Sequence, residues 1–136
     1  MKNKPFYVEF PITVRSYDID VNDHVSNIVY IRWLEDMRMT MLDTYMPYEA
    51  IRKKGLSLIL IRTEIDYKRG IGLFEKPLLQ GWIEGLEGIR MYIRARFLVE
   101  GRVAASARQT GVFLDMNRQR PARMPSIFIQ KMKEWE

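Results

Sequence analysis

The spacing of apolar side chains predicts a strand, a long helix and then a series of strands. Residues 6–14 carry an apolar side chain at every second position, which is typical of a half-buried strand, and Pro11 within it favours a sheet edge or a bulge. Between Asn27 and Tyr45 the apolar positions recur every three or four residues, which predicts an amphipathic helix. Because the apolar arc of this helix is wide, we expect a sheet to curl around it.

The rest of the chain predicts a short helix followed by a sheet. A helical connector is expected at residues 48–54, where Gly55 ends it. Apolar and polar residues then alternate in four segments that we predict to be strands: residues 57–67, 77–84, 89–99 and 103–114. The Glu100-Gly101 pair predicts a tight turn between the last two strands. This order favours an α+β protein in which long antiparallel strands wrap one central helix.

Length and composition fit one small domain. The chain has 136 residues, 47% apolar and 29% charged, so we expect a single domain over residues 1–136. Its longest apolar run, Leu58–Ile61, is too short to cross a bilayer, and the N-terminal residues include Glu9 and no sustained apolar stretch. We therefore expect no signal peptide and no membrane partner. The absence of cysteine fits a cytoplasmic protein and excludes disulfides.

Several kinds of catalytic site are excluded by what the chain lacks. With no cysteine and one histidine, the usual zinc sites and a cysteine nucleophile are excluded. The chain contains no G-x-S-x-G, no P-loop and no G-x-G-x-x-G, and we expect neither a metal nor a cofactor. If the protein is a hydrolase, a carboxylate must therefore carry the reaction.

Polar residues cluster directly before the long helix. Seven consecutive positions contain five of them: Asp18, Asp20, Asn22, Asp23 and His24, the only histidine. Closely spaced carboxylates beside an imidazole and a helix N-terminus are suited to attack on a carbonyl group. The same pattern is also typical of turns and helix caps, in which the side chains only hold the loop. Asp18 is expected to have such a structural role.

The pattern D-x-D-V-N-x-H-V-x-N-x-x-Y-I-x-W resembles the hotdog-fold thioesterases, in particular the 4-hydroxybenzoyl-CoA thioesterase branch and the related acyl-ACP thioesterases. The resemblance covers residues 14–125, and its most specific matches are Asp18, Asp20, His24, Val25, Asn27, Tyr30 and Glu35. Asp23 replaces a common glycine, and Ser26 replaces the first asparagine. Gly70 stands where the acyl-ACP enzymes carry a glutamate after the next strand.

The resemblance implies a hotdog fold and the hydrolysis of an acyl- or aryl-CoA thioester. It implies that Asp20 acts as nucleophile or as general base, with Asn22 and His24 orienting water or the carboxylate. The first turn of the helix, near Asn27, offers unpaired N–H groups for an oxyanion, and Tyr30 is expected to contact the substrate. One alternative is an acyl-ACP thioesterase that uses Asp20, Asn22 and His24. Another is a non-catalytic protein that binds acyl thioesters or nucleic acid.

Charged residues suggest the remaining partners. The net charge is +5, and Lys68, Arg69 and Arg120 are expected to bind CoA phosphates, or the acidic surface of an acyl carrier protein. A merely solvated basic face is the alternative. Aromatic residues alternate into core positions and do not interleave with the arginines, so nucleic acid is not expected as a partner. Glu35 and Arg38, three positions apart, are expected to form a structural or subunit-interface ion pair.

The expected assembly is a homodimer or a homotetramer. A single sheet with one central helix leaves an open strand edge. The resemblance also implies that the site forms where two protomers pair.

Overall fold

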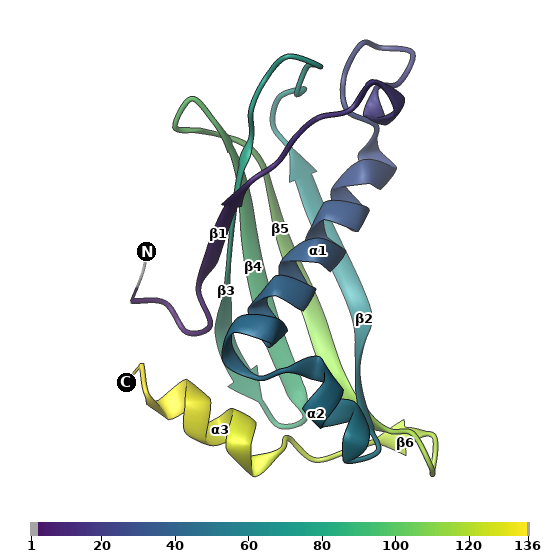
Figure 1. Cartoon of the computed structure of the whole chain (residues 1–136), viewed down its shortest axis with the longest axis vertical. Coiled ribbons are helices and arrows are strands. Elements are labelled where there is room, and N and C mark those ends of the chain that lie inside the picture. Colours follow the sequence, from purple (N-terminus) through teal and green to yellow (C-terminus); the bar gives the residue numbers. More distant parts are fainter. Residues whose placement is uncertain (1–2, 136) are drawn as a thin grey trace.

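A computed structural model describes residues 3–135 of the chain (Figure 1). The helices are η1 (Ser16–Asp18), α1 (Asn27–Tyr45), α2 (Tyr48–Lys53) and α3 (Ser126–Lys133). The strands are β1 (Val8–Pro11), β2 (Leu56–Tyr67), β3 (Leu78–Glu87), β4 (Arg90–Val99), β5 (Arg102–Asp115) and β6 (Arg120–Pro121). Within the described residues, no helix is long and apolar enough to cross a membrane.

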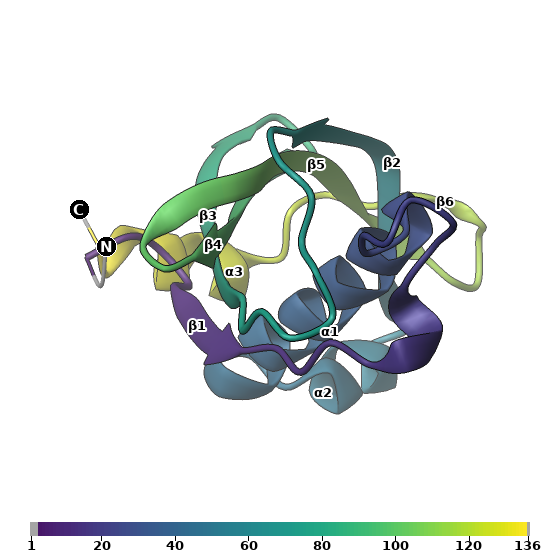
Figure 2. The same cartoon turned by 90° about the horizontal axis from the view of Figure 1, so that it is seen from above.

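The strands form one antiparallel sheet that curls around α1. The strand order is β1-β3-β4-β5-β2, and the short β6 pairs with β5. Seen from above, the sheet forms an arc with α1 on its inner side (Figure 2). The predicted α+β architecture, a long central helix wrapped by a curved antiparallel sheet, is therefore confirmed.

The inner face of the sheet and one face of α1 form the core. Leu34 and Met37 of α1 are fully buried, as are alternate residues of β4 such as Phe97. The helix approaches the sheet closely at Gly81, where an added Cβ would overlap Met37 Sδ. A residue without a side chain is needed at this point, since a packed core has no room for both groups.

The long helix and the hairpin lie where the sequence predicts them. α1 has the predicted bounds, and Glu100 and Gly101 form the turn between β4 and β5 with φ values of +51° and +76°. The alternation predicted for residues 57–67 is broken, because the pairing of β2 with β5 shifts between Leu60 and Arg62. This irregularity turns Ile61 outward, and its side chain is 51% exposed.

The predicted strand at residues 6–14 is shorter in the structure, where β1 covers Val8–Pro11. Phe6 adopts a left-handed φ of +58° and turns away from the sheet ladder into an aromatic cluster. As Pro11 suggested, β1 is an edge strand, and within residues 3–135 it pairs only with β3.

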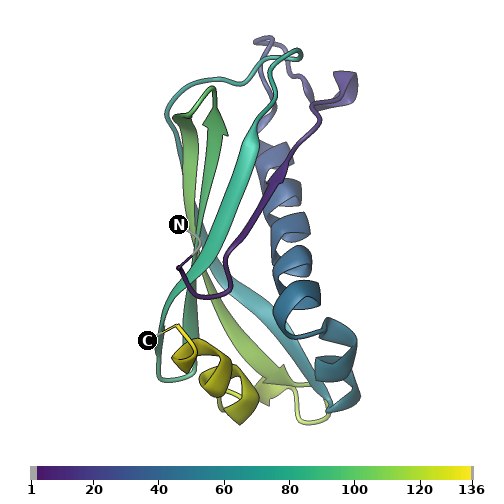
Figure 3. The same cartoon turned by 60° about the vertical axis from the view of Figure 1, so that its left-hand side comes forward.

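The C-terminal helix α3 is not predicted by the sequence pattern. It lies across the end of the sheet that is farther from the start of α1 (Figure 3). Its residue Phe128 is 1% exposed and packs against Phe6 and Phe113, at ring-centroid distances of 4.9 and 5.6 Å. Its eight residues pack on Phe6 and Phe113, which are distant in the chain, so the local pattern does not show where this helix lies.

Candidate active site

The polar loop before α1 is held by backbone hydrogen bonds. Asp18 is buried; its Oδ2 accepts a hydrogen bond from the Arg15 N–H at 2.8 Å, and its carbonyl accepts one from the Ser26 N–H at 2.8 Å. Ile19 and Val25 form an isolated antiparallel bridge across the loop. Asp18 therefore has a structural role in this loop.

Asp20 shapes the tip of the loop through one carboxylate oxygen. Its Oδ1 accepts hydrogen bonds from the N–H groups of Asn22 at 2.9 Å and His24 at 3.4 Å. In the part of the chain that the structure describes, the other oxygen, Oδ2, accepts no hydrogen bond. Asp23 has a left-handed φ of +61°. Glycine adopts this conformation most readily, which explains why it is common at this position in the hotdog-fold thioesterases. Aspartate is among the few other residues that tolerate a left-handed φ.

A second loop, between β2 and β3, supports the first one. The Val25 N–H donates to the Ile71 carbonyl at 2.8 Å, and an added Cβ at Gly70 would overlap the imidazole of His24. Gly70 thus provides the space that the His24 ring occupies. From the sequence, Gly70 was noted only because it stands where the acyl-ACP thioesterases carry a glutamate; its contact with His24 was not predicted.

Glu75 and Arg69 hold the second loop in shape. The Arg69 guanidinium donates to Glu75 Oε1 and Oε2 at 3.3 and 2.6 Å and to the Gly70 carbonyl at 3.0 Å. Glu75 Oε1 also accepts from the Gly72 N–H at 2.9 Å. Arg69 therefore fixes the backbone on which His24 rests.

The two loops and the start of α1 line a cavity of about 210 Å³ that is open to solvent. The lining residues are Asp20, Asn22, His24, Val25, Asn27, Tyr30, Tyr67, Arg69 and Gly70. The structure thus brings together six residues that we predicted for the site from the sequence: Asp20, Asn22, His24, Asn27, Tyr30 and Arg69. Tyr67, which the sequence placed only as a strand residue, is an additional member.

Tyrosines form an aromatic wall of this cavity. Tyr30 is 2% exposed and lies edge-on to Tyr67, with ring centroids 5.0 Å apart. The Tyr67 hydroxyl donates to the Asn27 carbonyl at 3.2 Å and so ties the end of β2 to the start of α1. Burial raises the pKa of Tyr30 to about 12, and it also raises the pKa of Tyr67. Both hydroxyls are therefore neutral hydrogen-bond donors near pH 7.

The N-terminus of α1 contributes a positive pole to the cavity. The helix begins at Asn27, and the side chain of its N-cap residue, Ser26, makes no capping hydrogen bond. The first N–H groups of a helix lack partners within the helix, and the aligned peptide dipoles make this end electropositive. Such an end stabilises an oxyanion that develops next to it.

Two predicted ligand residues do not line the cavity. Lys68 is exposed, and its backbone N–H bonds to the Ala104 carbonyl at 2.9 Å. Arg120 lies in β6 opposite Asp115, which pairs with the first residue of β2, whereas Tyr67 is the last residue of β2. Arg120 is therefore at the opposite end of the molecule from the cavity (Figure 1). Within one chain, Arg120 and Arg69 therefore cannot contact the same bound ligand.

The predicted ion pair between Glu35 and Arg38 is present and lies outside the cavity. Arg38 is buried, and it also donates to Gln109 Oε1 at 2.7 Å. Burial lowers the pKa of the Arg38 guanidinium. Among residues 3–135, no group of three or more His, Asp or Glu side chains is arranged to hold a metal ion.

Comparisons with known proteins agree with this architecture. The family model of the thioesterase-like superfamily matches residues 14–135. Long-chain acyl-CoA thioesterase FadM of Escherichia coli is 25% identical over 126 residues, which are 90% of this chain and 95% of the relative. A Thermus thermophilus thioesterase, solved with coenzyme A and zinc, has a TM-score of 0.85 at 24% identity and covers 100% of this chain and 97% of its own.

A Staphylococcus aureus protein solved in complex with CoA has a TM-score of 0.87 at 15% identity, over 97% of this chain and 85% of its own. These structures share the curled sheet and central helix of the hotdog thioesterases. Because the family match extends over most of the chain, from before the polar loop to the end of α3, the protein is a hotdog-fold member of the thioesterase-like superfamily.

Proposed function

We propose that this protein hydrolyses acyl-CoA thioesters to a free acid and CoA, with Asp20 as nucleophile or as general base. The observation that carries the proposal is the cavity itself. It combines a carboxylate that has one free oxygen, the only imidazole of the chain and the N-terminus of α1. These are the groups that attack on a thioester carbonyl requires.

In the proposed reaction the thioester carbonyl oxygen lies at the N-terminus of α1. As a base, Asp20 takes a proton from water while the water oxygen bonds to the carbonyl carbon. The tetrahedral intermediate then collapses, the carbon–sulfur bond breaks, and the CoA sulfur takes up the proton. As a nucleophile, Asp20 instead bonds to the carbonyl carbon and the carbon–sulfur bond breaks, which gives an anhydride and the CoA thiolate. Water then opens the anhydride to the free acid and the Asp20 carboxylate, and a proton from this water goes to the thiolate. In both routes Asn22 and His24 orient the water.

The acyl group is proposed to be a fatty chain. Apolar side chains in both loops that form the cavity are strongly exposed, with Val21 at 98% and Phe74 at 91%. Such side chains fit an apolar chain or an apolar partner surface. The related Escherichia coli enzyme is named as a long-chain acyl-CoA thioesterase, which favours the same class here.

The test is Asp20→Asn, assayed by thiol release from a panel of acyl-CoA, aryl-CoA and acyl carrier protein thioesters. An asparagine keeps the acceptor for the Asn22 and His24 N–H groups, so the loop should keep its shape. We expect kcat to fall by about 10² to 10⁴. Asp23→Asn is the matched control, because it removes a carboxylate from the same loop and asparagine tolerates the left-handed φ.

The outcome that contradicts the proposal is an Asp20→Asn variant that keeps more than about half of the wild-type kcat. Wild-type hydrolysis of carrier-protein thioesters alone would instead assign the acyl-ACP alternative. A wild-type protein that hydrolyses none of the panel would favour a non-catalytic binding role.

We further propose that the active form is a homodimer or a homotetramer. β2 is the last strand of the sheet and pairs only with β5 among the described residues, so its outer edge is open. An open edge of twelve residues, with the apolar Ile61 exposed, is a surface on which a second copy can pair. Antiparallel pairing of two such strands would bring β6 of one copy near the cavity of the other. In that arrangement Arg120 would reach a CoA phosphate.

Light scattering combined with activity at micromolar concentration tests the assembly. An active monomer would contradict it. Arg120→Gln should raise KM for acyl-CoA with little change in kcat, because the contact is remote from the carbonyl. Acyl-pantetheine, which lacks the nucleotide, should not be affected, and equal losses on both substrates would refute the phosphate contact.

A further inference from the structure

A second cavity lies at the opposite end of α1 from the candidate active site. Its volume is about 140 Å³; α2, α3 and the start of β2 line it, and it is open to solvent on one side. Met46, Ile51, Leu56 and Ile127 contribute apolar side chains to its wall. Because Leu56 and Tyr67 are the two ends of β2, the cavities are separated by roughly 35 Å along this strand. They share no lining residue.

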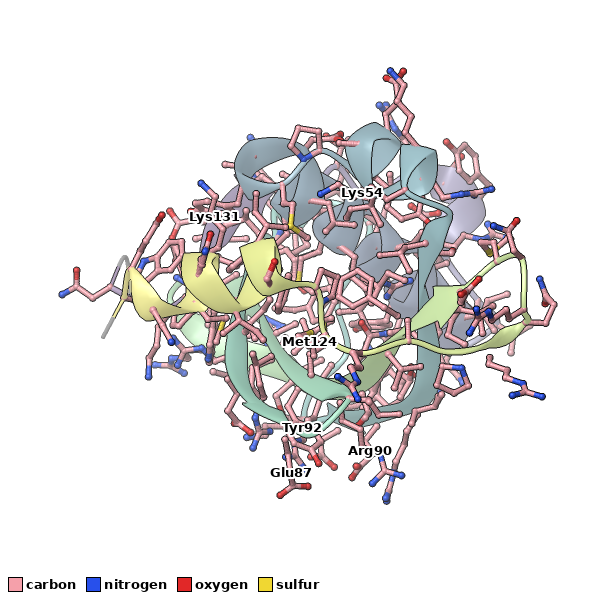
Figure 4. The ribbon with its side chains drawn as sticks, turned by 90° about the horizontal axis from the view of Figure 1, so that it is seen from below. Lys54, Glu87, Arg90, Tyr92, Met124 and Lys131 are labelled. Atoms are coloured by element: carbon pink, nitrogen blue, oxygen red, sulfur yellow. The ribbon has the colours of Figure 1, made fainter. Side chains whose placement is uncertain are left out.

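Two lysines border this apolar cavity. Lys54 follows α2 and Lys131 belongs to α3, and both line the cavity. Figure 4 views the molecule from this end and labels both residues, one beside each helix. Among residues 3–135, Lys54 forms no ion pair, and Lys131 Nζ forms a long, partly exposed ion pair with Glu134 Oε1 at 4.0 Å. The charge of Lys54 is therefore unpaired, and a bound anion would compete with Glu134 for Lys131.

We propose that this cavity binds a free medium-chain carboxylic acid. The alkyl chain would occupy the apolar cavity, and the carboxylate would lie between Lys54 and Lys131. A dry apolar cavity of about 150 Å³ accommodates a benzene ring, so this cavity has room for about six carbon atoms. An apolar wall with two cations at its border complements an amphipathic anion better than it complements a neutral lipid or a nucleotide.

The proposal concerns binding, and it rests on the proposed function only for the source of the ligand. Thioester hydrolysis releases a carboxylic acid, so the protein would meet this ligand as its own product. The cavity is distinct from the site of hydrolysis, and its occupancy can be measured without any turnover.

The experiment measures binding of saturated carboxylates, from butanoate to dodecanoate, by isothermal titration calorimetry. The affinity should rise about fourfold per methylene group and level off once the chain fills the cavity, near octanoate. Octanol, which lacks the charge, should bind more weakly than octanoate. Equal affinities for octanol and octanoate would overturn the role of the lysines, and no octanoate binding at millimolar concentration would overturn the site.

Variants locate the binding. Lys54→Ala with Lys131→Ala should weaken octanoate binding by about three- to thirtyfold, the effect of two partly exposed ion pairs. The matched control is Lys53→Ala with Lys133→Ala, which changes the net charge equally at neighbouring positions that do not line the cavity. Equal weakening by both pairs would show that only the overall charge matters, and would refute the site.

Ala50→Phe provides an independent test by filling the cavity, since Ala50 lines it. If circular dichroism shows that the Ala50→Phe variant is folded, it should no longer bind octanoate. If this variant does not fold, the double lysine variant remains the test of the site. Asp20→Asn should leave octanoate binding unchanged. If Asp20→Asn abolishes binding and Ala50→Phe does not, the acid occupies the active site and the proposal fails. This result would leave the proposed hydrolysis intact.

Discussion

The two ends of α1 are built in different ways. At its N-terminal end, two loops are joined by the backbone hydrogen bond from Val25 to Ile71, and the side chains of Asn22 and His24 are exposed. At its C-terminal end, aromatic rings of four residues pack at centroid distances of 4.9 to 5.5 Å: Phe6, Tyr45, Phe128 and Trp135. The polar end is therefore available for chemistry, and the apolar end holds the helix to the sheet.

This difference separates function from stability. Replacing an exposed polar side chain at the N-terminal end removes few packing contacts, so activity should change far more than the free energy of unfolding. Replacing a buried ring at the other end leaves a cavity, so stability should change far more than activity. The predictions for Phe128 and Gly70 test this division, and the prediction for Tyr30 concerns a buried residue at the polar end.

The largest expected effect is that of Phe128→Ala. Removing a ring that is 1% exposed should lower the free energy of unfolding by about 3–5 kcal/mol, measured by urea denaturation. The kcat per folded molecule should be unchanged, because the ring lies at the opposite end of α1 from the candidate site. Gln130→Ala, an exposed position on the same helix, is the control and should change stability by less than about 0.5 kcal/mol. A large loss of kcat in folded Phe128→Ala would break the division.

Gly70→Ala should have an effect of intermediate size, which lowers the activity and leaves the stability unchanged. The new Cβ would overlap Cγ and Nδ1 of the His24 imidazole, so this exposed ring must shift. We expect kcat/KM to fall by about tenfold to a hundredfold, as small misplacements of catalytic groups do, with the urea midpoint nearly unchanged. Gly72→Ala is the matched control, because its Cβ would come no closer than 3.8 Å to Glu75 Oε1.

A double mutant gives the Gly70 prediction its sharper form. His24→Ala should cost about as much as Gly70→Ala, and combining the two should add little, because both remove the same positioned ring. Additive losses would mean that Gly70 acts on something other than His24. Unfolding of His24→Ala in circular dichroism would make His24 a structural residue of the loop.

The smallest effect concerns Tyr30 and alkaline pH. The pKa of Tyr30 is about 12 in the folded protein against 10.0 for a free tyrosine, so above pH 10 the unfolded state loses this proton first. The stability that Tyr30 contributes is complete below pH 10 and is lost between pH 10 and 12, by about 1 kcal/mol per pH unit. Tyr30→Phe should reduce this slope in urea denaturation at pH 9 to 11. Tyr17→Phe, at an 80% exposed position, should not.

Much of the fold follows from local sequence patterns. The bounds of α1 were predictable because its apolar residues recur with helical spacing over nineteen positions. The β4–β5 hairpin was predictable because Glu100-Gly101 separates two strongly alternating segments. The helix α3 was not predictable, since its position depends on Phe128 meeting Phe6, more than a hundred residues earlier in the chain.

The polar loop from Asp20 to Asn27 shows what the sequence determined by itself. These residues are close in space because they are close in the chain, and the turn chemistry of Asp20 and Asp23 shapes the loop locally. Only the tertiary structure decided that Tyr67 and Gly70 complete the cavity, and that Arg69 lines it whereas Lys68 does not. The same holds for the outward turn of Ile61 and for the placement of Lys54 and Lys131 at the border of one cavity. Each of these depends on a local irregularity in strand pairing or on packing between distant segments, and the alternation within one segment shows neither.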